Sequence, residues 1–178
     1  ANLQCQRLSL SGFSFVGTDI GGFAGVPSGE LLVRWLQLAI FHPFYRIHSM
    51  GNNVDGAAEA EADQVAEAER LNRLDQEPWA FGEETEALAK AAIELRYELL
   101  PYIYSAFYQH VHDGLPVLRS LAFVDQNDPN THKRENEFMF GDQLLVSPVV
   151  KEKARSVSTY LPKGQWFDYY TGRSYMGG

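Results

Sequence analysis

The stretch that decides the fold is Ser11-Gly-Phe-Ser-Phe-Val-Gly-Thr-Asp-Ile-Gly-Gly-Phe-Ala-Gly25. Its apolar and small residues lead into Asp19, and two glycines and an aromatic side chain follow that carboxylate. A short, nearly continuous apolar run is typical of a buried parallel strand, so we expect Asp19 at the end of such a strand. Gly21 and Gly22 let the backbone turn sharply there. In barrels of parallel strands, ligand sites gather at the carboxyl ends of the strands, and Asp19 is therefore a candidate site residue.

A second segment of the same kind is Phe41-His-Pro-Phe-Tyr-Arg-Ile-His48, where His48 precedes polar, Gly-rich sequence. The residues between the two segments predict a helix, with Ser28 as its N-cap and Glu30 in its first turn. An apolar stripe supports this helix and consists of Leu31, Leu32, Trp35, Leu38 and Ala39. A strand, a helix and a strand with short connections form a βαβ unit with parallel strands. We therefore expect Asp19 and His48 to project from the same end of one sheet.

Length and composition limit the class of protein. With 178 residues the chain holds one ordinary domain, or an incomplete domain and part of another. An apolar content of 45% is enough for a packed core and argues against disorder. The net charge of −8 argues against nucleic acid or an anionic membrane surface as the main partner. The aromatic content of 13% fits a sugar or small-molecule site and a well-packed core equally well.

Cysteine usage and apolar runs bear on the location of the protein. Cys5 is the single cysteine, so the sequence predicts no intrachain disulfide framework and no cysteine-based metal site. No apolar run reaches membrane-spanning length, and no stretch is recognisable as a signal peptide. A soluble, cytoplasmic or periplasmic protein is expected rather than a disulfide-rich extracellular one. Residues 1–10 have a helical pattern and no initiator Met, which predicts the interior of a longer protein.

Beyond the second segment the pattern becomes helical. Residues 49–76 include an Ala/Glu-rich stretch, which is typical of an exposed helical insertion that covers or borders a site. The longest helix is predicted from Glu83 to His112, with a kink at Pro101 and a stop at Gly114. Its core-facing stripe is predicted to consist of Leu88, Ala92, Leu95, Leu99 and Ile103.

From residue 117 onward the pattern changes to short strands separated by turn signals. The predicted strands lie within residues 117–124, 138–140, 144–146, 157–160 and 166–170. Strands of this length and spacing predict an all-β sandwich. We expect that sandwich to be incomplete within this chain.

An ordered series of motifs spans nearly the whole sequence. It consists of Gly17-Thr-Asp-Ile-Gly-Gly-Phe23, Arg34-Trp35, Pro43-Phe44 with Arg46-x-His48, Glu77-Pro-Trp79, Leu95-Arg-Tyr-Glu-Leu-Leu-Pro-Tyr-Ile-Tyr104, Gly114-Leu-Pro-Val-Leu-Arg119, Phe138-Met-Phe-Gly-Asp-Gln-Leu-Leu-Val-Ser-Pro148 and Tyr160-Leu-Pro-Lys-Gly-Gln-Trp166. With this series the chain resembles glycoside hydrolase family 31, the α-glucosidase family.

The resemblance implies an α/β fold, with the C-terminal portion of a (β/α)8 TIM barrel followed by an incomplete all-β sandwich domain. Residues 1–117 would hold the last strands and helices of the barrel, with the insertion at 49–76. Residues 118–178 would form the N-terminal part of the sandwich. The family's nucleophile and its acid/base are aspartates in motifs that this chain does not contain, so no catalytic residue is expected in it. The chain would then need the missing N-terminal barrel segments, or an oligomeric partner, and would be inactive alone.

The resemblance also implies a retaining α-glucosidase that acts on an α-linked oligosaccharide or glucoside, without a metal or any other cofactor. Asp19 and His48 would line the subsite for the non-reducing-end sugar, and Phe23 would form part of its apolar wall. Apart from the resemblance, Asp19 could also act through a neighbouring cation, for which Arg46 is the nearest candidate in the sequence. These residue types suit a sugar, because carboxylate and imidazole bind hydroxyl groups while an aromatic ring covers the C–H face of a pyranose.

Other residues have more ordinary interpretations. Arg46 itself is also interpreted as a buried structural charge partner. Trp35 and Trp79 are expected in the core, and His42, which precedes a proline, is expected to be structural. Glu77 is interpreted as a turn or helix-entry residue rather than a catalytic acid.

Alternative functions stay open from the sequence. The chain could belong to an α-xylosidase or a transglycosidase of the same family, or to a sugar-binding module that catalyses nothing. A metal-dependent hydrolase that uses Asp19, His42 and His48 is a further alternative. The sequence offers it no His-x-x-x-His pair on a helix and no third strong ligand.

Overall fold

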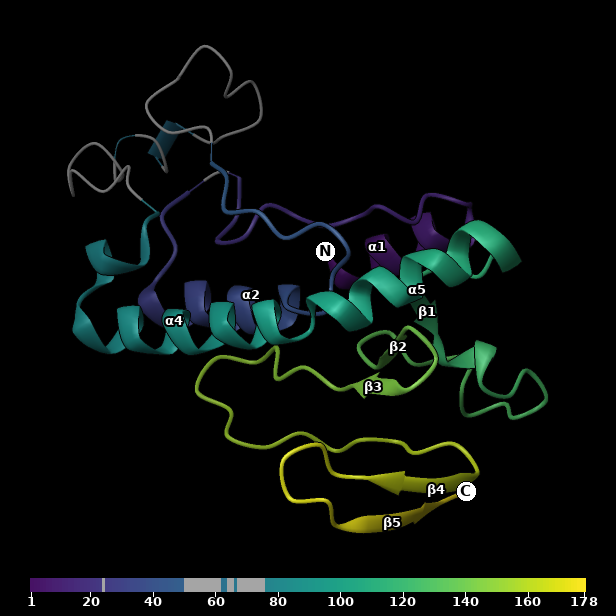
Figure 1. The fold of residues 1–178 in the computed structure, drawn as a ribbon. Helices are drawn as coiled ribbons and strands as arrows, with labels where there is room; N and C mark the ends of the chain where they lie inside the picture. Colours follow the sequence, from purple (N-terminus) through teal and green to yellow (C-terminus); the bar gives the residue numbers. More distant parts are fainter. Residues whose placement is uncertain (24, 50–61, 64–65, 67–75) are drawn as a thin grey trace.

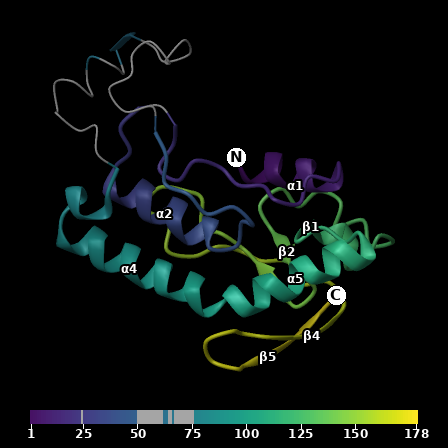
Figure 2. The same cartoon turned by 45° about the horizontal axis from the view of Figure 1, so that its top comes forward.

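The computed structural model describes residues 1–23, 25–49, 62–63, 66 and 76–178. Its elements are α1 (Asn2–Leu10), α2 (Gly29–Ala39), η2 (Pro78–Phe81), α4 (Glu83–Glu98), α5 (Leu100–Asp113), β1 (Leu118–Ser120), η3 (Leu121–Phe123), β2 (Phe138–Phe140), β3 (Leu144–Val146), β4 (Gly164–Phe167) and β5 (Ser174–Gly177). Figures 1 and 2 show α2 beside α4, α1 beside the sheet strands, and the β4–β5 hairpin away from α1. The chain thus consists of helices followed by short antiparallel strands.

The two segments predicted as parallel strands lie side by side, but neither forms a full strand. Ile20 and Ile47 form an isolated parallel bridge. The N–H of Phe44 donates to the carbonyl oxygen of Val16 at 2.9 Å, and the N–H of Ile20 donates to that of Arg46 at 3.0 Å. The parallel direction is therefore confirmed. The extent of the predicted strands is wrong, because the pairing stops after these bonds and forms no longer ladder.

Helix α2 occupies the predicted place between the two segments. Ser28 is its N-cap, and the Ser28 hydroxyl oxygen accepts a hydrogen bond from the Leu31 N–H at 3.2 Å. The buried stripe begins one residue later than predicted, since Leu31 is 47% exposed. The fully buried side chains of α2 are instead Leu32, Leu36 and Ala39. Their spacing of four and three is that of one helix face.

The long helix predicted after residue 83 is divided into α4 and α5 at Leu99, which is the C-cap of one and the N-cap of the other. Pro101 lies in the first turn of α5, where the missing N–H removes no intrahelical hydrogen bond. Gly114 ends α5 with a left-handed φ of 73°, as predicted. Leu88 is exposed, which contradicts the predicted stripe, and Ala89 is buried in its place.

Strands β1, β2 and β3 form an antiparallel sheet in that order. Phe140 on the central strand is paired with Leu118 on one side and with Leu144 on the other. Strands β4 and β5 form a separate antiparallel hairpin. The predicted strands at 138–140 and 144–146 are confirmed.

The strand predicted at 157–160 is absent, and this prediction is wrong. The backbone N–H of Tyr160 donates to the Glu137 carboxylate at 3.1 Å, and its hydroxyl donates to Asp128 at 2.5 Å. The Arg134 guanidinium lies 4.7 Å from the centroid of the Tyr160 ring. Contacts with side chains therefore hold this segment in place of the strand pairing that was predicted.

The core lies between α2, α4, α5 and the three-stranded sheet. Its largest fully buried side chains include Phe138, Phe140, Ile20, Leu32, Leu36 and Leu118. Because Ile20 belongs to this core, the residue before it is directed away from the core.

The predicted insertion at 49–76 lies almost wholly outside the described residues. Within it, Ala62, Asp63 and Ala66 are described, and they are helical and exposed.

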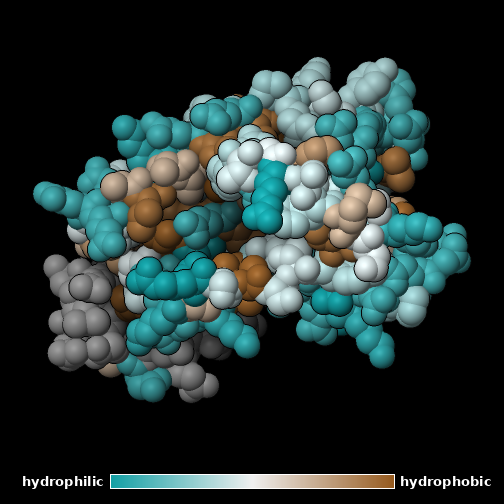
Figure 3. Space-filling model, turned by 90° about the horizontal axis from the view of Figure 1, so that it is seen from below, coloured by the Kyte–Doolittle hydropathy of each residue, from teal (hydrophilic) through white to brown (hydrophobic). Residues whose placement is uncertain are grey.

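On the face seen in Figure 3, apolar patches alternate with hydrophilic side chains. No helix among the described residues has the length and apolar character that a membrane span requires.

Candidate functional site

Asp19 and Arg46 meet where the two extended segments run side by side. The Arg46 Nη2 donates to the Asp19 Oδ1 at 2.8 Å. The Arg46 side chain is 46% exposed and that of Asp19 is 25% exposed, so water screens much of the ion pair's energy. The described residues form no other hydrogen bond to this carboxylate, so its second oxygen is available to a donor from outside.

The backbone directs these two side chains to the same face. Ile20 and Ile47 are opposite each other at the parallel bridge, and Asp19 and Arg46 each precede one of them. Side chains alternate along extended backbone, so the acid and the arginine both lie on the face opposite the buried Ile20.

Glycines shape the backbone on both sides of Asp19. A Cβ atom at Gly17 would lie 2.1 Å from the carbonyl oxygen of Phe44, so only glycine permits this approach of the two segments. The Gly22 N–H donates to the Asp19 carbonyl oxygen at 3.0 Å and closes a turn. Gly21 and Gly22 have φ angles of 89° and 91°, which glycine adopts without strain. The sharp turn predicted from these glycines is present.

Phe23 and His48 lie together after this turn. Their ring centroids are 5.7 Å apart and the rings are tilted by 36°. Phe23 is 45% exposed, and His48 is exposed as well. An apolar ring and a group that both donates and accepts hydrogen bonds are thus accessible side by side.

An open pocket of about 440 Å³ connects most of these groups. Its wall is formed by Gly17, Thr18, Asp19, Gly22, Phe23, Trp35, Phe44 and Arg46. Of the four candidate residues, the structure places three in this wall. The fourth, His48, contacts the pocket through its neighbour Phe23.

Besides Gly17 and Gly22, three wall residues were not predicted as site residues, namely Thr18, Trp35 and Phe44. The Phe44 ring lies 5.1 Å from the Arg46 guanidinium carbon, in a cation–π arrangement. Strand alternation is a signal that could have identified Phe44, because it is two residues before Arg46. Trp35 packs against the core as predicted and also reaches the pocket, which no local sequence pattern indicates.

Two interpretations of single residues need correction, and one holds. Arg46 is the charge partner of a carboxylate as expected, but it is exposed rather than buried. Trp79 is 67% exposed, so its expected core position is wrong. Trp79 belongs to the short helix η2, whose N-cap is Glu77. The predicted helix-entry role of Glu77 is therefore confirmed.

His42 lies away from this pocket. Its side chain is fully buried, and its Nε2 is 3.3 Å from the Asn2 Oδ1. Burial lowers the pKa of His42 to about 4, and the nearby Arg96 adds to the effect. His42 therefore does not join Asp19 and His48. In the described part of the chain, no group of three or more His, Cys, Asp or Glu side chains is arranged to hold a metal ion.

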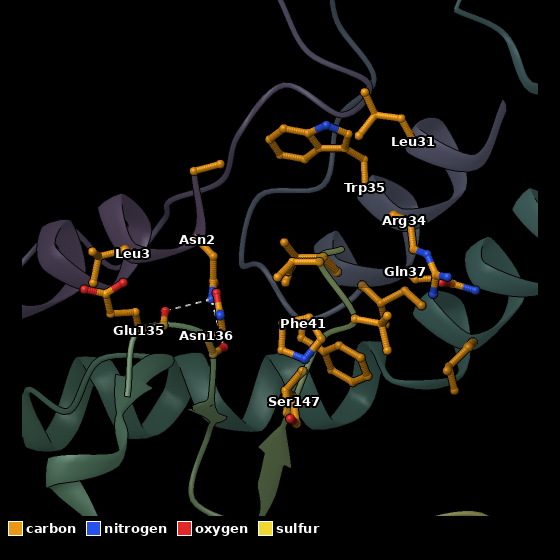
Figure 4. A pocket seen from close by; sticks show the side chains of 18 of the residues that line it. Asn2, Leu3, Leu31, Arg34, Trp35, Gln37, Phe41, Glu135, Asn136 and Ser147 are labelled. Atoms are coloured by element: carbon orange, nitrogen blue, oxygen red, sulfur yellow. Dashed lines mark hydrogen bonds between the residues drawn. The ribbon is translucent and has the colours of Figure 1, made fainter. Parts of the chain in front are cut away.

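A second pocket, of about 580 Å³, lies between helices α1 and α2 and the C-terminal part of the chain. Figure 4 shows Asn2 on one side of it, Arg34 and Gln37 on α2, and Asn136 among the C-terminal residues. The Asn2 side-chain amide donates to the Asn136 carbonyl oxygen at 3.0 Å. Trp35 borders both pockets, and none of the four candidate residues lines this one.

Two family models match consecutive parts of the chain. The glycosyl hydrolases family 31 TIM-barrel domain matches residues 2–106, and the glycosyl hydrolase family 31 C-terminal domain matches residues 114–178. The helical part of the chain and the part with antiparallel strands thus match consecutive domains of one class of proteins, the glycosyl hydrolases. The chain belongs to glycosyl hydrolase family 31. The resemblance identified from the sequence motifs is confirmed.

Known proteins match the chain along nearly its whole length. "Alpha-glucosidase 2" of Bacillus thermoamyloliquefaciens is 38% identical over 174 residues, which are 98% of this chain and 20% of that protein. A family 31 dextranase of Flavobacterium johnsoniae, solved with glucose, is 31% identical with a TM-score of 0.77 over 97% of this chain and 20% of its own. A family 31 α-xylosidase from a soil metagenome, solved with xylose, is 30% identical with a TM-score of 0.78 over 97% of this chain and 26% of its own. The chain spans about a fifth of the length of the curated relatives it matches.

Proposed function

We propose that this chain is part of a retaining α-glucosidase that hydrolyses terminal α-linked glucose from oligosaccharides. Residues 1–117 would form the last strands and helices of its (β/α)8 barrel, and residues 118–178 the N-terminal part of a β-sandwich. Two matched domain models in this order support the division. The name of the Bacillus relative supports the choice of an α-glucosidase.

The observation that carries the proposal is the Asp19–Arg46 ion pair in the wall of a pocket that also contains Phe23. The carboxylate accepts hydrogen bonds from sugar hydroxyl groups through the oxygen that Arg46 leaves free. The Phe23 ring covers an apolar face of the pyranose, and His48 beside it exchanges hydrogen bonds with a further hydroxyl. Asp19, Phe23, Arg46 and His48 are thus proposed as the substrate-binding residues.

In this proposal the chain binds and orients the sugar and supplies no reacting group. A retaining glycosidase uses two carboxyl groups about 5–5.5 Å apart, one as nucleophile and one as acid and then base. These groups would come from polypeptide outside this chain. The residues described here would hold the non-reducing-end ring so that its anomeric carbon faces the nucleophile. The isolated chain is accordingly expected to turn over no aryl α-glucoside.

The proposal is tested in the full-length enzyme with an aryl α-glucoside as substrate. Removing the charge with Asp19→Asn should raise KM about tenfold to a hundredfold, because hydrogen bonds to a charged group contribute about 1.5–3 kcal/mol. Asp113→Asn, at the exposed end of α5, is the matched control and should leave KM unchanged. An unchanged KM in Asp19→Asn would contradict the site. Glucose binding by a wild-type enzyme without turnover would favour a non-catalytic sugar-binding module.

The identity of the sugar is tested with a second substrate. An α-xylosidase matches this chain about as well as the dextranase does, so an aryl α-xyloside is the informative competitor. Xylose lacks the hydroxymethyl group of glucose. A kcat/KM higher for the xyloside would replace the α-glucosidase proposal by an α-xylosidase. Products longer than the substrate would indicate a transglycosidase.

A further inference from the structure

Arg96 is a buried arginine on α4 with an unusual set of partners. It is 8% exposed, and no ion pair among the described residues includes it. Its Nη1 donates to the carbonyl oxygens of Ile40 at 2.5 Å and His42 at 2.7 Å, and its Nη2 donates to that of Pro43 at 2.8 Å. The charge is therefore compensated by backbone carbonyl groups of one turn.

These carbonyl groups follow the C-terminal end of α2. The last carbonyl groups of a helix have no intrahelical partner and carry partial negative charge, which favours a cation. Ile40 is the C-cap of α2, and the turn from Ile40 to Pro43 leads directly into the segment that carries Arg46 and His48. The planar guanidinium presents donors in a fixed fork, so it binds several carbonyl oxygens at once.

Arg96 also contacts the same segment from behind. Its guanidinium carbon lies 5.5 Å from the centroid of the Tyr45 ring, which packs against the core. Burial raises the pKa of the Tyr45 hydroxyl to about 12, so this ring is neutral at ordinary pH. Tyr45 is between Phe44 and Arg46, and these two neighbours face the pocket. Arg96 thus contacts the core-facing side of this segment, while the opposite side forms part of the pocket wall.

The pocket-facing side of the segment is joined to residues 15–20 by few contacts, among them the Asp19–Arg46 ion pair and the contact between the Phe15 and Phe44 rings. Between the described residues 16–20 and 44–46, two backbone hydrogen bonds set the position of one segment against the other. The first of them begins at Phe44, the residue after the turn that Arg96 binds. A shift of this turn therefore moves Arg46 and His48 relative to Asp19.

We propose that Arg96 is a positioning residue of the sugar site, which holds the Ile40–Pro43 turn and the Tyr45 ring so that Arg46 and His48 lie beside Asp19. This inference rests on the proposed function. It assigns to a buried residue of α4 a role in substrate affinity, in addition to its role in stability.

The test compares Arg96→Lys and Arg96→Met with Ala92→Gly in the full-length enzyme. Ala92 is buried on α4 one turn before Arg96, so its substitution weakens the same helix and removes none of the side-chain hydrogen bonds to the turn. Lysine keeps the charge but lacks the fork. We expect KM for an aryl α-glucoside to rise about tenfold in Arg96→Lys and further in Arg96→Met, since misplacement by about 1 Å costs up to a hundredfold. Ala92→Gly should lower thermal stability and leave KM unchanged.

Amide hydrogen exchange gives a readout that does not need turnover. Exchange at Ile20 and Phe44, the two amides that join the segments, should be faster in Arg96→Lys than in Ala92→Gly. If Arg96→Lys is less stable but has an unchanged KM and unchanged exchange at these amides, the positioning role is overturned. If the wild-type enzyme hydrolyses no α-glucoside, the proposed function fails. In that case, exchange rates that are equal in the two variants would overturn the positioning role separately.

Discussion

The three-stranded sheet and the pair of segments under the site are both extended backbone, but they are held in different ways. In the sheet, Phe140 is paired on both sides and its ring is fully buried together with that of Phe138. At the site, Ile20 and Ile47 form a single bridge, and the residues around it expose polar and aromatic side chains. The sheet contributes stability through burial, whereas the segment pair has one face in the core and one face available to a ligand.

The largest expected effect is a loss of stability in the three-stranded sheet. Phe140→Ala should lower the local free energy of unfolding by about 3–5 kcal/mol, because it removes a fully buried ring and leaves a cavity. Native-state hydrogen exchange of the β2 amides in the full-length enzyme measures this change. Phe167→Ala, at a ring that is 63% exposed, is the control and should change the same quantity by less than about 0.5 kcal/mol. Equal effects of the two substitutions would contradict the difference in burial.

Next to the site, substitution should be tolerated least at Gly17, where the two segments approach each other most closely. Gly17→Ala brings a Cβ atom against the Phe44 carbonyl oxygen and should cost about 3 kcal/mol, with a higher KM for the sugar. Gly12→Ala is the control, because Gly12 has a left-handed φ of 92° and no atom near its Cβ position. It should cost about 1 kcal/mol and leave KM unchanged. Thermal unfolding and steady-state kinetics together separate the two effects.

His42, in the turn from Ile40 to Pro43, should make the free energy of unfolding depend on pH. Its pKa is about 4 in the folded protein and close to 6.5 when unfolded, so the unfolded chain binds a proton first as the pH falls. Stability should therefore decrease between about pH 6.5 and pH 4, by about 2 kcal/mol from pH 7 to pH 5. Urea unfolding at these two pH values measures it. His42→Gln should be less stable at pH 7 but should lose this part of the pH dependence, and an unchanged pH dependence would exclude His42 as its source.

The smallest expected effect concerns the apolar wall of the pocket. Phe23→Ala should weaken glucose binding by about 1 kcal/mol, or roughly fivefold, through loss of aromatic contact area. Its thermal stability should be unchanged, because the ring is 45% exposed. Phe13→Ala, at another exposed ring that does not line the pocket, should affect neither quantity. Titration with glucose provides the comparison, and equal affinities of the two variants would remove Phe23 from the site.

Features with a local cause could be predicted from the sequence. The Ser28 cap, the kink predicted at Pro101, which the structure shows as a division at Leu99, and the Gly114 stop each depend on the chemistry of residues that are neighbours in the chain. The sharp turn after Asp19 has the same kind of origin, since Gly21 and Gly22 adopt positive φ angles whatever surrounds them. These predictions hold without knowledge of any distant contact.

Features that depend on packing could not be predicted in this way. Leu31 and Leu88 satisfy a helical stripe as well as Leu32 and Ala89 do, and only the position of the neighbouring elements decides which of them is buried. Tyr160 was expected in a strand, yet its backbone N–H is bound by the carboxylate of Glu137.

The candidate site has both kinds of origin. The motifs indicated Asp19, Phe23, Arg46 and His48 as its residues, and the structure shows the ion pair and the ring contact among them. Thr18, Trp35 and Phe44 belong to these motifs as well, but their place in the pocket wall depends on how the segments pack, as do the hydrogen bonds of Arg96 to the turn behind it.

The sequence by itself determined the family, the order of helices and strands, and the residue types that suit a sugar, because motifs, caps and turns depend on short-range chemistry. Only the tertiary structure decided that Arg46, the cation predicted beside Asp19, is exposed rather than buried, and that a buried arginine holds the turn behind it. These contacts join residues that are 27 and 54 positions apart along the chain. Their geometry depends on how α2 and α4 pack, and no pattern of neighbouring residues contains that information.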